Sequence, residues 1–289
     1  MKKNSKIVAL ILVLALALTF SVGCAKDKSE SDSDAKETSI FRTLDEIKDS
    51  GKIVIGVFSD KAPFGYIDAD GDYQGYDVEL ANRIGKDLGV DVEYVSLDPA
   101  SRVEYLETGK VDIVLANFTV TDERAKSVDF ANPYMKVQLG VVSPESAPID
   151  DIKDLDGKKF ILVKGTTAET YFTENENGAE LIKFDAYEDA YNALLDGRGD
   201  AFSTDNTEVL AWAKENAGFT VGIDALGDID AIAPAVSKGN TTLLDWLNDE
   251  LTKLGSELFF HAAYEKTLAP VYGTDADPDS LVVEGVPLS

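Results

Sequence analysis

Residues 53–58 read IVIGVF, a short run that is almost entirely apolar and rich in β-branched side chains. An apolar run without polar alternation is typical of a strand that is buried on both faces. The segment 77–88 has apolar residues three to four positions apart and ends before Gly89, which predicts an amphipathic helix with a glycine cap. A buried strand followed by an amphipathic helix indicates a βα unit in a parallel sheet.

Outward from this unit, strand and helix patterns alternate in two successive series. The predicted strands are residues 53–58, 92–95, 112–116, 160–163, 181–184 and 201–203. The predicted helices are residues 77–88, 101–108, 167–175, 186–196, 206–215, 241–254 and 257–268. Alternation of this kind predicts an α/β fold built from parallel sheets.

An internal similarity indicates that the two series are related halves. Residues 106–112 (LETGKVD) resemble residues 195–200 (LDGRGD), and in both a Gly precedes an Asp by three positions. A polar side chain stands five residues after each Asp, Asn117 in the first series and Asp205 in the second. A G-x-x-D turn between a helix and a strand is common by chance. The evidence for a duplication therefore depends on the wider alternation of strands and helices. If the halves are homologous, Asn117 and Asp205 lie at the carboxyl ends of equivalent strands, where open α/β sheets bind ligands, and two facing lobes would present both to one cleft.

The composition excludes several classes of protein. The chain has 27 basic and 53 acidic residues, and its formal net charge of −26 opposes the phosphate neutralisation that nucleic-acid binding requires. Its single Cys, Cys24, cannot form an internal disulfide. One Cys and one His, His261, cannot build a Cys/His zinc site or an H-E-x-x-H metalloprotease helix. We therefore expect no nucleic-acid partner, no metal and no cofactor, and we expect His261 to be an ordinary residue of a C-terminal helix.

The N-terminus has the pattern of a secretory signal peptide over residues 1–23. Three lysines precede a 14-residue apolar run, residues 7–20, which is shorter than the roughly 20 residues needed to span a bilayer. Residues 21–24 (SVGC) resemble the lipobox of bacterial lipoproteins, whose Cys is lipidated and becomes the mature N-terminus. We expect a lipid anchor (palmitate) on Cys24 and a disordered tether over residues 24–39, which would hold the protein at the extracytoplasmic face of the cell membrane. The alternatives are an ordinary signal peptide with an incidental Cys, or an uncleaved anchor.

Two loops carry side chains suited to an amino-acid zwitterion. A carboxylate removed from water needs a cation and hydrogen-bond donors, and an ammonium needs an anion or acceptors. In residues 117–124 (NFTVTDER), Thr121 or its neighbour is a candidate N-cap that leaves N–H groups free for an anion, and Arg124 can bind a carboxylate bidentately. In the second half, residues 164–167 (KGTT) offer N–H groups and hydroxyls, and Asp205 can take the ammonium. The plainer alternatives are a solvated helical Arg124 and a helix N-cap at Asp205.

Several short motifs together carry a family resemblance. They are residues 62–66 (APFGY), 75–78 (GYDV), 109–112 (GKVD), 119–124 (TVTDER), 128–130 (VDF), 133–134 (PY) and 165–167 (GTT). From about Thr43 to its end, the chain resembles family 3 of the extracellular solute-binding proteins, the amino-acid receptors of ATP-driven (ABC) importers. The resemblance implies the type II periplasmic-binding-protein fold, which is α/β with two doubly wound lobes joined by two crossover strands. It implies lobe 1 at residues 40–143 and 237–289, lobe 2 at residues 144–236, and crossings near residues 141–143 and 232–236.

The same resemblance implies roles for individual residues. The ligand α-carboxylate would be bound by Arg124 with Thr119 and Thr167. The α-ammonium would be bound by Asp205 with help from Asn117. The ligand-binding set implied in this way consists of Lys61, Phe64, Arg102, Asn117, Phe118, Thr119, Arg124, Thr166, Thr167 and Asp205.

Departures from the family pattern bear on which amino acid is bound. Many relatives have an acidic residue at the position of Phe58 and an aromatic one at that of Lys61, and those groups read cationic side chains. Phe58 and Lys61 therefore argue against arginine, lysine or histidine. Other stretches look like the cysteine-binding subgroup of the family; these are residues 55–61, 115–118, 205–207 and 231–236.

Arg102 points to a second class of ligand. A cation at its position is similar to one that meets the side-chain carboxylate in aspartate- and glutamate-binding relatives, although a surface helix residue is the plainer interpretation. An acidic ligand brings one more negative charge, which would cost several kcal/mol if left unpaired in a closed cleft, so Lys61 or Arg102 would have to meet it. We expect cysteine as the ligand, with glutamate or aspartate as the alternative.

These expectations together describe a monomeric, membrane-tethered receptor. It would close on a free polar amino acid and deliver it to the transmembrane permease subunits of an ABC importer. No activated nucleophile accompanies the motifs, so we expect no enzyme activity. One alternative is a dehydratase on the same fold, for which Asp60, Asp122 and Glu169 are the acids near the predicted loops. Another is a sensor or adhesion protein without transport.

Overall fold

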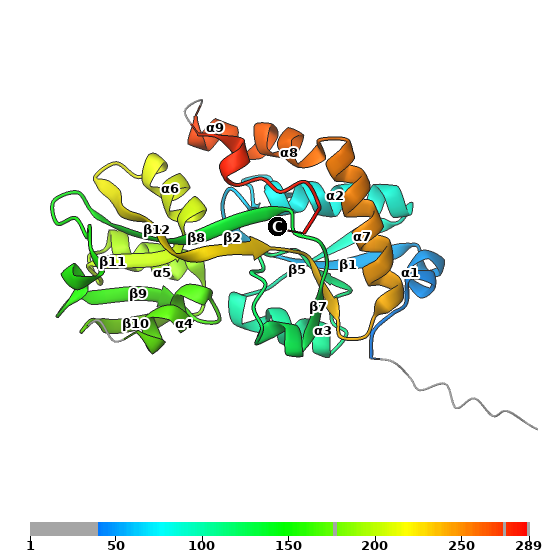
Figure 1. Cartoon of the computed structure of the whole chain (residues 1–289), viewed down its shortest axis with the longest axis horizontal. Helices are drawn as coiled ribbons and strands as arrows, with labels where there is room; N and C mark the ends of the chain where they lie inside the picture. The colour runs from blue at the N-terminus through cyan, green and yellow to red at the C-terminus, as the bar shows by residue number, and fades with distance from the viewer. Residues whose placement is uncertain (1–39, 176–177, 274–275, 288–289) are drawn as a thin grey trace, which may run out of the picture. The chain divides into compact units, whose positions relative to one another are not determined.

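The computed structural model of the protein describes residues 40–175, 178–273 and 276–287 (Figure 1). The predicted signal peptide, the predicted lipidation site Cys24 and the predicted tether over residues 24–39 all lie outside these ranges. Within them, no helix has both the length and the apolar character that crossing a membrane requires.

The described chain contains two five-stranded sheets and one small three-stranded sheet. The first sheet has the order β5 (Asp91–Ser96), β1 (Lys52–Val57), β6 (Ile113–Val114), β13 (Ala235–Ser237) and β7 (Val128–Phe130). The second has the order β10 (Glu180–Phe184), β9 (Lys159–Val163), β11 (Ala201–Asp205), β8 (Met135–Pro144) and β12 (Phe219–Ile232). The small sheet has the order β2 (Asp60–Lys61), β3 (Gly65–Ile67) and β4 (Tyr73–Gln74).

The two large sheets follow the same plan. In each, three strands are parallel, β1, β5 and β6 in one sheet and β9, β10 and β11 in the other, and the first of these three in chain order lies between the second and the third. In each, the fourth position is taken by a strand antiparallel to the third, β13 against β6 and β8 against β11. Asn117 follows the third strand of the first sheet and Asp205 ends the third strand of the second. The shared strand order is the one that the internal duplication predicted from the sequence would produce.

The helices lie between and after the strands (Figure 1). They are α1 (Leu44–Ser50), α2 (Tyr76–Leu88), α3 (Arg102–Glu107), α4 (Thr167–Glu174), α5 (Tyr187–Leu195), α6 (Asn206–Glu215), α7 (Thr241–Ser256), α8 (Phe259–Thr267) and α9 (Ala269–Tyr272). Short 3₁₀ turns cover residues 99–101, 124–126, 152–155 and 278–280. Every strand and helix predicted from the sequence is present to within two residues at each end. The α2 helix ends as expected, because Gly89 adopts the left-handed conformation with φ +74° and closes the last turn.

Three clusters of buried apolar side chains form the core. Ile53, Ile55 and Val57 of β1 are fully buried, which explains the apolar run at residues 53–58. A second cluster joins Phe58 and Phe118, which flank strands of the first sheet, to residues of the second half such as Tyr187. The two halves therefore share an apolar contact next to the strand ends that carry Asn117 and Asp205.

The chain passes between the two sheets at one place earlier than predicted. It leaves the first sheet at Phe130 and enters the second at Met135, whereas residues 141–143 pair with β11 and β12 inside the second sheet. The predicted crossing at residues 141–143 is therefore wrong, because the apolar run of β8 shows a buried strand without showing which sheet it joins. The second predicted crossing, residues 232–236, is confirmed, since β12 ends at Ile232 and β13 begins at Ala235. β8 and β12 run side by side where they leave the second sheet (Figure 1).

Candidate functional site

The two residues predicted to face one cleft meet in the structure. The side-chain amide of Asn117 donates to Asp205 Oδ2 over 2.7 Å, and both side chains are buried. Asn117 has a left-handed backbone with φ +45°, which Asn adopts more readily than most residues, and its N–H donates to Asp77. Asp205 is the N-cap residue of α6, but its side chain makes no cap hydrogen bond. The carboxylate of Asp205 therefore belongs to the contact between the halves rather than to the helix end.

Arg124 lies beside this contact and reaches across to the second half. Its Nη1 donates to the carbonyl of Thr119 over 2.7 Å and its Nη2 donates to the carbonyl of Gly165 over 2.9 Å. The Thr121 hydroxyl accepts the Arg124 N–H, as a cap would, but the turn that follows is a three-residue 3₁₀ segment instead of a longer helix. Burial, with a smaller contribution from the neighbouring Arg102, lowers the pKa of Arg124 to about 9, although Asp205 opposes the decrease.

Arg102 is buried, with 3 % of its surface exposed, so its interpretation as a surface helix residue is wrong. Its guanidinium donates to the carbonyls of Pro99, Ala116 and Asn117 at 3.0, 3.0 and 3.2 Å. A fourth bond goes to Gly165 of the second half at 3.0 Å. Four of its five N–H groups are thus engaged by backbone oxygens, which makes Arg102 a cross-link between the halves.

Gly165 is the point at which both guanidinium groups meet the second half. It has φ +76°, and a Cβ placed on it would lie 2.5 Å from the Cα of Ala100. Only a residue without a side chain fits so close to another backbone, which explains the Gly of the GTT motif. The two arginines of the first half can approach one carbonyl of the second half for this reason.

Lys61 is the most enclosed cation of the site, with 1 % of its surface exposed. Its ammonium lies 3.1 Å from Asp205 Oδ2, 3.0 Å from Glu208 Oε2 and 3.2 Å from the hydroxyl of Tyr187. Neither Glu208 nor Tyr187 was among the site residues predicted from the sequence. Glu208 stands three residues after Asp205 at helical spacing, which was the available signal, but an acid in a first helical turn is usually explained by the helix dipole alone.

The remaining predicted residues surround these charges. Phe118 lies under two cations, with its ring centroid 4.6 Å from the guanidinium carbon of Arg102 and 4.9 Å from that of Arg124. Thr166 caps α4 by accepting the Glu169 N–H, and its hydroxyl donates to Val163, so it is occupied locally. The hydroxyls of Thr119 and Thr167 make no hydrogen bond with any residue that the structure describes. Phe64 packs near the Lys61 ammonium.

Burial shifts the acids of this region toward their neutral forms. It raises the pKa of Glu208 to about 7; Asp205 adds to the increase, and Lys61 opposes it. It also raises the pKa of Asp77 to about 6, against hydrogen bonds from Tyr134 and Asn117. For Lys61, burial lowers the pKa, but Asp205 and Glu208 raise it more, and it stays well above its usual range. One lysine thus stands between two carboxylates, and burial favours the neutral form of one of them, Glu208.

Two buried acceptors of the site have no hydrogen-bond partner within the described ranges. They are Asn117 Oδ1 and Glu208 Oε1. Asp205 accepts both of its donors, Asn117 and Lys61, on Oδ2. Its other oxygen, Oδ1, receives none from the residues described. Asn117 Oδ1 and Asp205 Oδ1 are therefore available to a donor from outside the chain.

The acids considered for a dehydratase are differently placed. Asp60 accepts the N–H groups of Tyr187 and Glu188 at 2.9 and 3.2 Å, and so caps α5 from the other half. Glu169 accepts the Gly165 N–H at 2.7 Å and pairs with a lysine, and Asp122 is exposed. His261 lies in α8, as expected, and pairs with Asp279 and Glu284.

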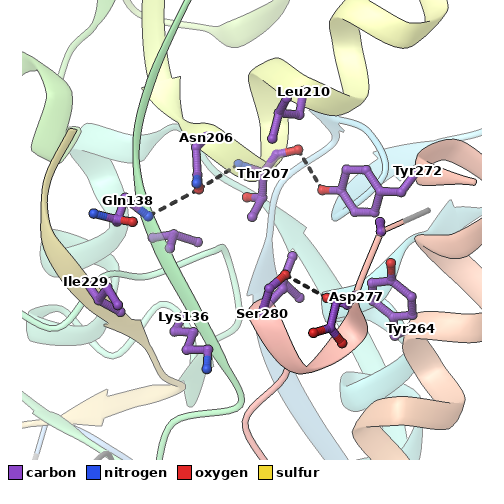
Figure 2. A pocket seen from close by; sticks show the side chains of 13 residues that line it. Lys136, Gln138, Asn206, Thr207, Leu210, Ile229, Tyr264, Tyr272, Asp277 and Ser280 are labelled. Carbon is purple, nitrogen blue, oxygen red and sulfur yellow. Dashed lines mark hydrogen bonds between the residues drawn. The ribbon is translucent and has the colours of Figure 1, made fainter. Parts of the chain in front are cut away.

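A separate cavity of about 230 Å³ lies elsewhere in the second half and the C-terminal segment (Figure 2). Figure 2 shows Gln138, Asn206 and Thr207 on one side of it and Tyr264, Asp277 and Ser280 on the other. It contains none of the residues predicted to bind ligand. The cavity is connected to the predicted ligand-binding residues through α6, because this helix begins at Asn206, which lines the cavity, directly after Asp205.

Known proteins are similar to this chain over most of its length. The family model "Bacterial extracellular solute-binding proteins, family 3" matches residues 53–269. A structure of the solute receptor for L-cysteine of Neisseria gonorrhoeae is 51% identical, covers 84% of this chain and 100% of its own, and has a TM-score of 0.82. The cysteine-binding protein of Campylobacter jejuni is 48% identical, with coverage of 83% and 98% and a TM-score of 0.82. The ABC transporter glutamine-binding protein GlnH of Bacillus subtilis is 31% identical over 229 residues, 78% of this chain and 84% of that protein.

Proposed function

This chain belongs to family 3 of the bacterial extracellular solute-binding proteins, and from that premise we propose that it captures free L-cysteine between its two halves for an ABC importer. The observation that carries the proposal is the pair of unused groups at the contact between the halves. Arg124 keeps N–H groups that its two carbonyl bonds do not use, and Asp205 keeps Oδ1. A guanidinium from one half and a carboxylate from the other can neutralise the two poles of one amino acid.

Neighbouring groups complete the recognition of the zwitterion. The free hydroxyls of Thr119 and Thr167 donate to the ligand carboxylate beside Arg124. The unpartnered Asn117 Oδ1 accepts from the ammonium beside Asp205. Each ligand pole then replaces its lost water with at least two hydrogen bonds, which offsets the cost of removing charge from water. The remaining members of the predicted set, Phe64, Phe118 and Thr166, shape the walls.

The charges of the site favour a ligand with a neutral side chain. Lys61 is already placed between Asp205 and Glu208, and Arg102 is bound to four carbonyls. Neither cation is free to meet a second ligand carboxylate, and an unpaired buried charge costs several kcal/mol. Glutamate or aspartate stays the alternative, and it would have to use the fifth N–H of Arg102. The cysteine receptors named above are similar in sequence over most of the chain, which supports the first choice.

A receptor explains the site better than an enzyme. The relatives that match this chain are described as binding proteins. Of the acids considered for a dehydratase, Asp60 and Glu169 hold backbone N–H groups, and Asp122 faces solvent. An acid engaged in this way is not positioned to move a proton on a ligand.

The N-terminal segment completes the proposal. We propose cleavage after residue 23, a lipid anchor with palmitate on Cys24, and a tether over residues 24–39 that keeps a monomeric receptor at the outer face of the cell membrane. The description of the family as extracellular supports export. Palmitate labelling of cells that express the chain tests the anchor. The Cys24→Ala variant should lose the label and leave the membrane fraction, and a variant that stays in that fraction would argue for an uncleaved anchor.

Ligand binding is tested by a thermal-shift and calorimetry panel of the twenty amino acids on the full chain. At 100 times the dissociation constant, L-cysteine should stabilise the protein by about 2.7 kcal/mol. The Arg124→Ala variant should lose this response, and Arg198→Ala, which removes an exposed arginine of the second half, should keep it. A response to glutamate instead of cysteine would select the alternative ligand. Absence of any response would count against the receptor itself.

A further inference from the structure

The ammonium of Lys61 lies inside a cage of aromatic rings. The ring centroids of Tyr187, Phe58 and Phe64 are 4.6, 5.5 and 5.9 Å from its Nζ. All three rings are fully buried or nearly so. Rings at such distances attract an ammonium through their negative faces, and the attraction grows when water is excluded.

Carboxylates complete the surroundings of the ammonium. Asp205 and Glu208 lie 3.1 and 3.0 Å from Nζ, and the Tyr187 hydroxyl lies 3.2 Å away. Lys61 comes from β2, whereas Tyr187, Asp205 and Glu208 belong to α5, β11 and α6 of the other half. The ammonium is thus held as a separate cationic ligand would be, by rings and anions of elements distant in sequence.

We propose that Phe58, Phe64, Tyr187 and Glu208 form a cation subsite that the Lys61 side chain fills from within. Removing that side chain would open the subsite to an external primary ammonium on a short alkyl chain. Such an ammonium can come from a free alkylammonium ion, or from the side chain of a diamino acid bound at the adjoining Asp205 and Arg124. The second source rests on the proposed function, and the first does not.

Occupation by Lys61 makes this residue a specificity determinant. Its positive charge repels a cationic ligand side chain, and its four-carbon stem takes up the volume that such a side chain would need. It also lies within 3.1 Å of both carboxylates and opposes the increase that burial causes in the pKa of Glu208. Without Lys61 the subsite keeps its rings and anions and lacks a cation, which is an unfavourable arrangement that an external ammonium corrects.

A surface groove borders the subsite at Glu208. Glu208 and Tyr191 line a groove of about 440 Å³ whose walls also include Asp60, Glu188 and Glu215. At this wall Glu208 Oε1 and the Tyr191 hydroxyl make no hydrogen bond of normal length with the residues described, and burial, with a contribution from Glu208, raises the pKa of Tyr191. An acidic groove bordered by Glu208 attracts small cations.

Chemical rescue tests the subsite without any amino acid. In Lys61→Ala, n-propylammonium replaces the missing three carbons and the nitrogen, and n-propanol is its neutral counterpart. We expect n-propylammonium at millimolar concentration to raise the melting temperature of Lys61→Ala by several degrees in a saturable manner. The wild type and Lys61→Met, which fills the cage with a neutral chain, should not respond. Equal shifts with n-propanol, or none with n-propylammonium, would overturn the proposal.

Two further measurements keep the test decisive. If Lys61→Ala does not fold alone, refolding should succeed in n-propylammonium and fail in n-propanol, and equal failure in both would overturn the proposal. Adding Glu208→Gln to Lys61→Ala should raise the half-saturating n-propylammonium concentration several-fold, because the neutral Gln offers the ammonium no negative charge. An unchanged half-saturating concentration would remove Glu208 from the subsite.

A diamino acid tests whether the subsite adjoins the amino-acid site. Lys61→Ala should gain binding of L-2,4-diaminobutyrate or L-ornithine over the neutral L-norvaline by at least tenfold, and the wild type should not. Rescue by n-propylammonium without this gain would confirm the cage and refute its place beside the ligand. If Arg124→Ala in the wild type leaves cysteine binding intact, the proposed function fails, whatever the rescue shows.

Discussion

Glu208 gives the sharpest prediction about stability and pH. Burial raises its pKa from 4.5 to about 7 in the folded chain, with a further contribution from Asp205. Between these two values the folded state binds the proton more tightly than the unfolded state, so stability falls as the pH rises through this window. The difference between these two pKa values corresponds to about 3 kcal/mol in the free energy of unfolding. The wild type should therefore lose about 3 kcal/mol through Glu208 between pH 4.5 and pH 7, and keep that loss above pH 7.

The assay is urea unfolding at pH 5, 6, 7 and 8 for the wild type, Glu208→Gln and Glu215→Gln. Gln cannot ionise, so the stability of Glu208→Gln relative to wild type should rise with pH by most of that amount. Glu215 is exposed on the same helix, so Glu215→Gln should follow the wild type. The raised pKa of Asp77, about 6, contributes a similar fall at lower pH in all three proteins. If the attraction of Lys61 outweighed burial, the wild type would instead gain on Glu208→Gln as the pH rises, and that result would refute the reasoning.

Three further predictions concern binding and the contact between the halves. Arg102→Ala leaves buried carbonyls without donors and should lower the free energy of unfolding by about 3 kcal/mol or more; in calorimetry it should weaken cysteine and glutamate alike, and loss of glutamate alone would restore its role as a side-chain reader. Gly165→Ala places a Cβ 2.5 Å from the Ala100 Cα and should cost about 2–3 kcal/mol, whereas Gly197→Ala, with φ +68° and open space, should cost about 1 kcal/mol in urea unfolding. Asp205→Asn removes the anion for the ligand ammonium and should weaken cysteine binding by about 2–5 kcal/mol in calorimetry; an affinity within a factor of three of wild type would contradict the assignment.

The sequence predicted the elements of the fold because their patterns are local. The local structure follows from the apolar pattern of the segment itself. An unbroken run gives the strand at residues 53–58, and a spacing of three to four gives the helix at residues 77–88. The repeated G-x-x-D turn also predicted a long-range result, the meeting of Asn117 and Asp205, because equivalent strands in duplicated sheets end at equivalent places. The first crossing between the sheets was not predictable, since β8 has the apolar pattern of a buried strand in either sheet.

The charges of the site show where local patterns stop being informative. Nothing in the spacing around Arg102 reveals that its guanidinium meets four carbonyls from three segments of the chain. Glu208 resembles any acid in a first helical turn until Lys61 is placed beside it from 147 positions earlier. Burial of a charge depends on what surrounds it in space, and the chain order of a single sequence does not contain that information.

The arrangement of Lys61 also explains how one carboxylate can serve two cations. Both donors from the chain, Lys61 and Asn117, meet Oδ2 of Asp205, and the proposed ligand would use Oδ1. An ammonium arriving at Oδ1 adds a second positive charge close to Lys61, which would be unfavourable if Asp205 were the sole anion nearby. Glu208 lies within 3.0 Å of Lys61 and, with its pKa near 7, can ionise when that charge arrives. The proposed site is thus balanced for a ligand that brings one positive and one negative pole, and a second ligand carboxylate would find only the fifth N–H of Arg102.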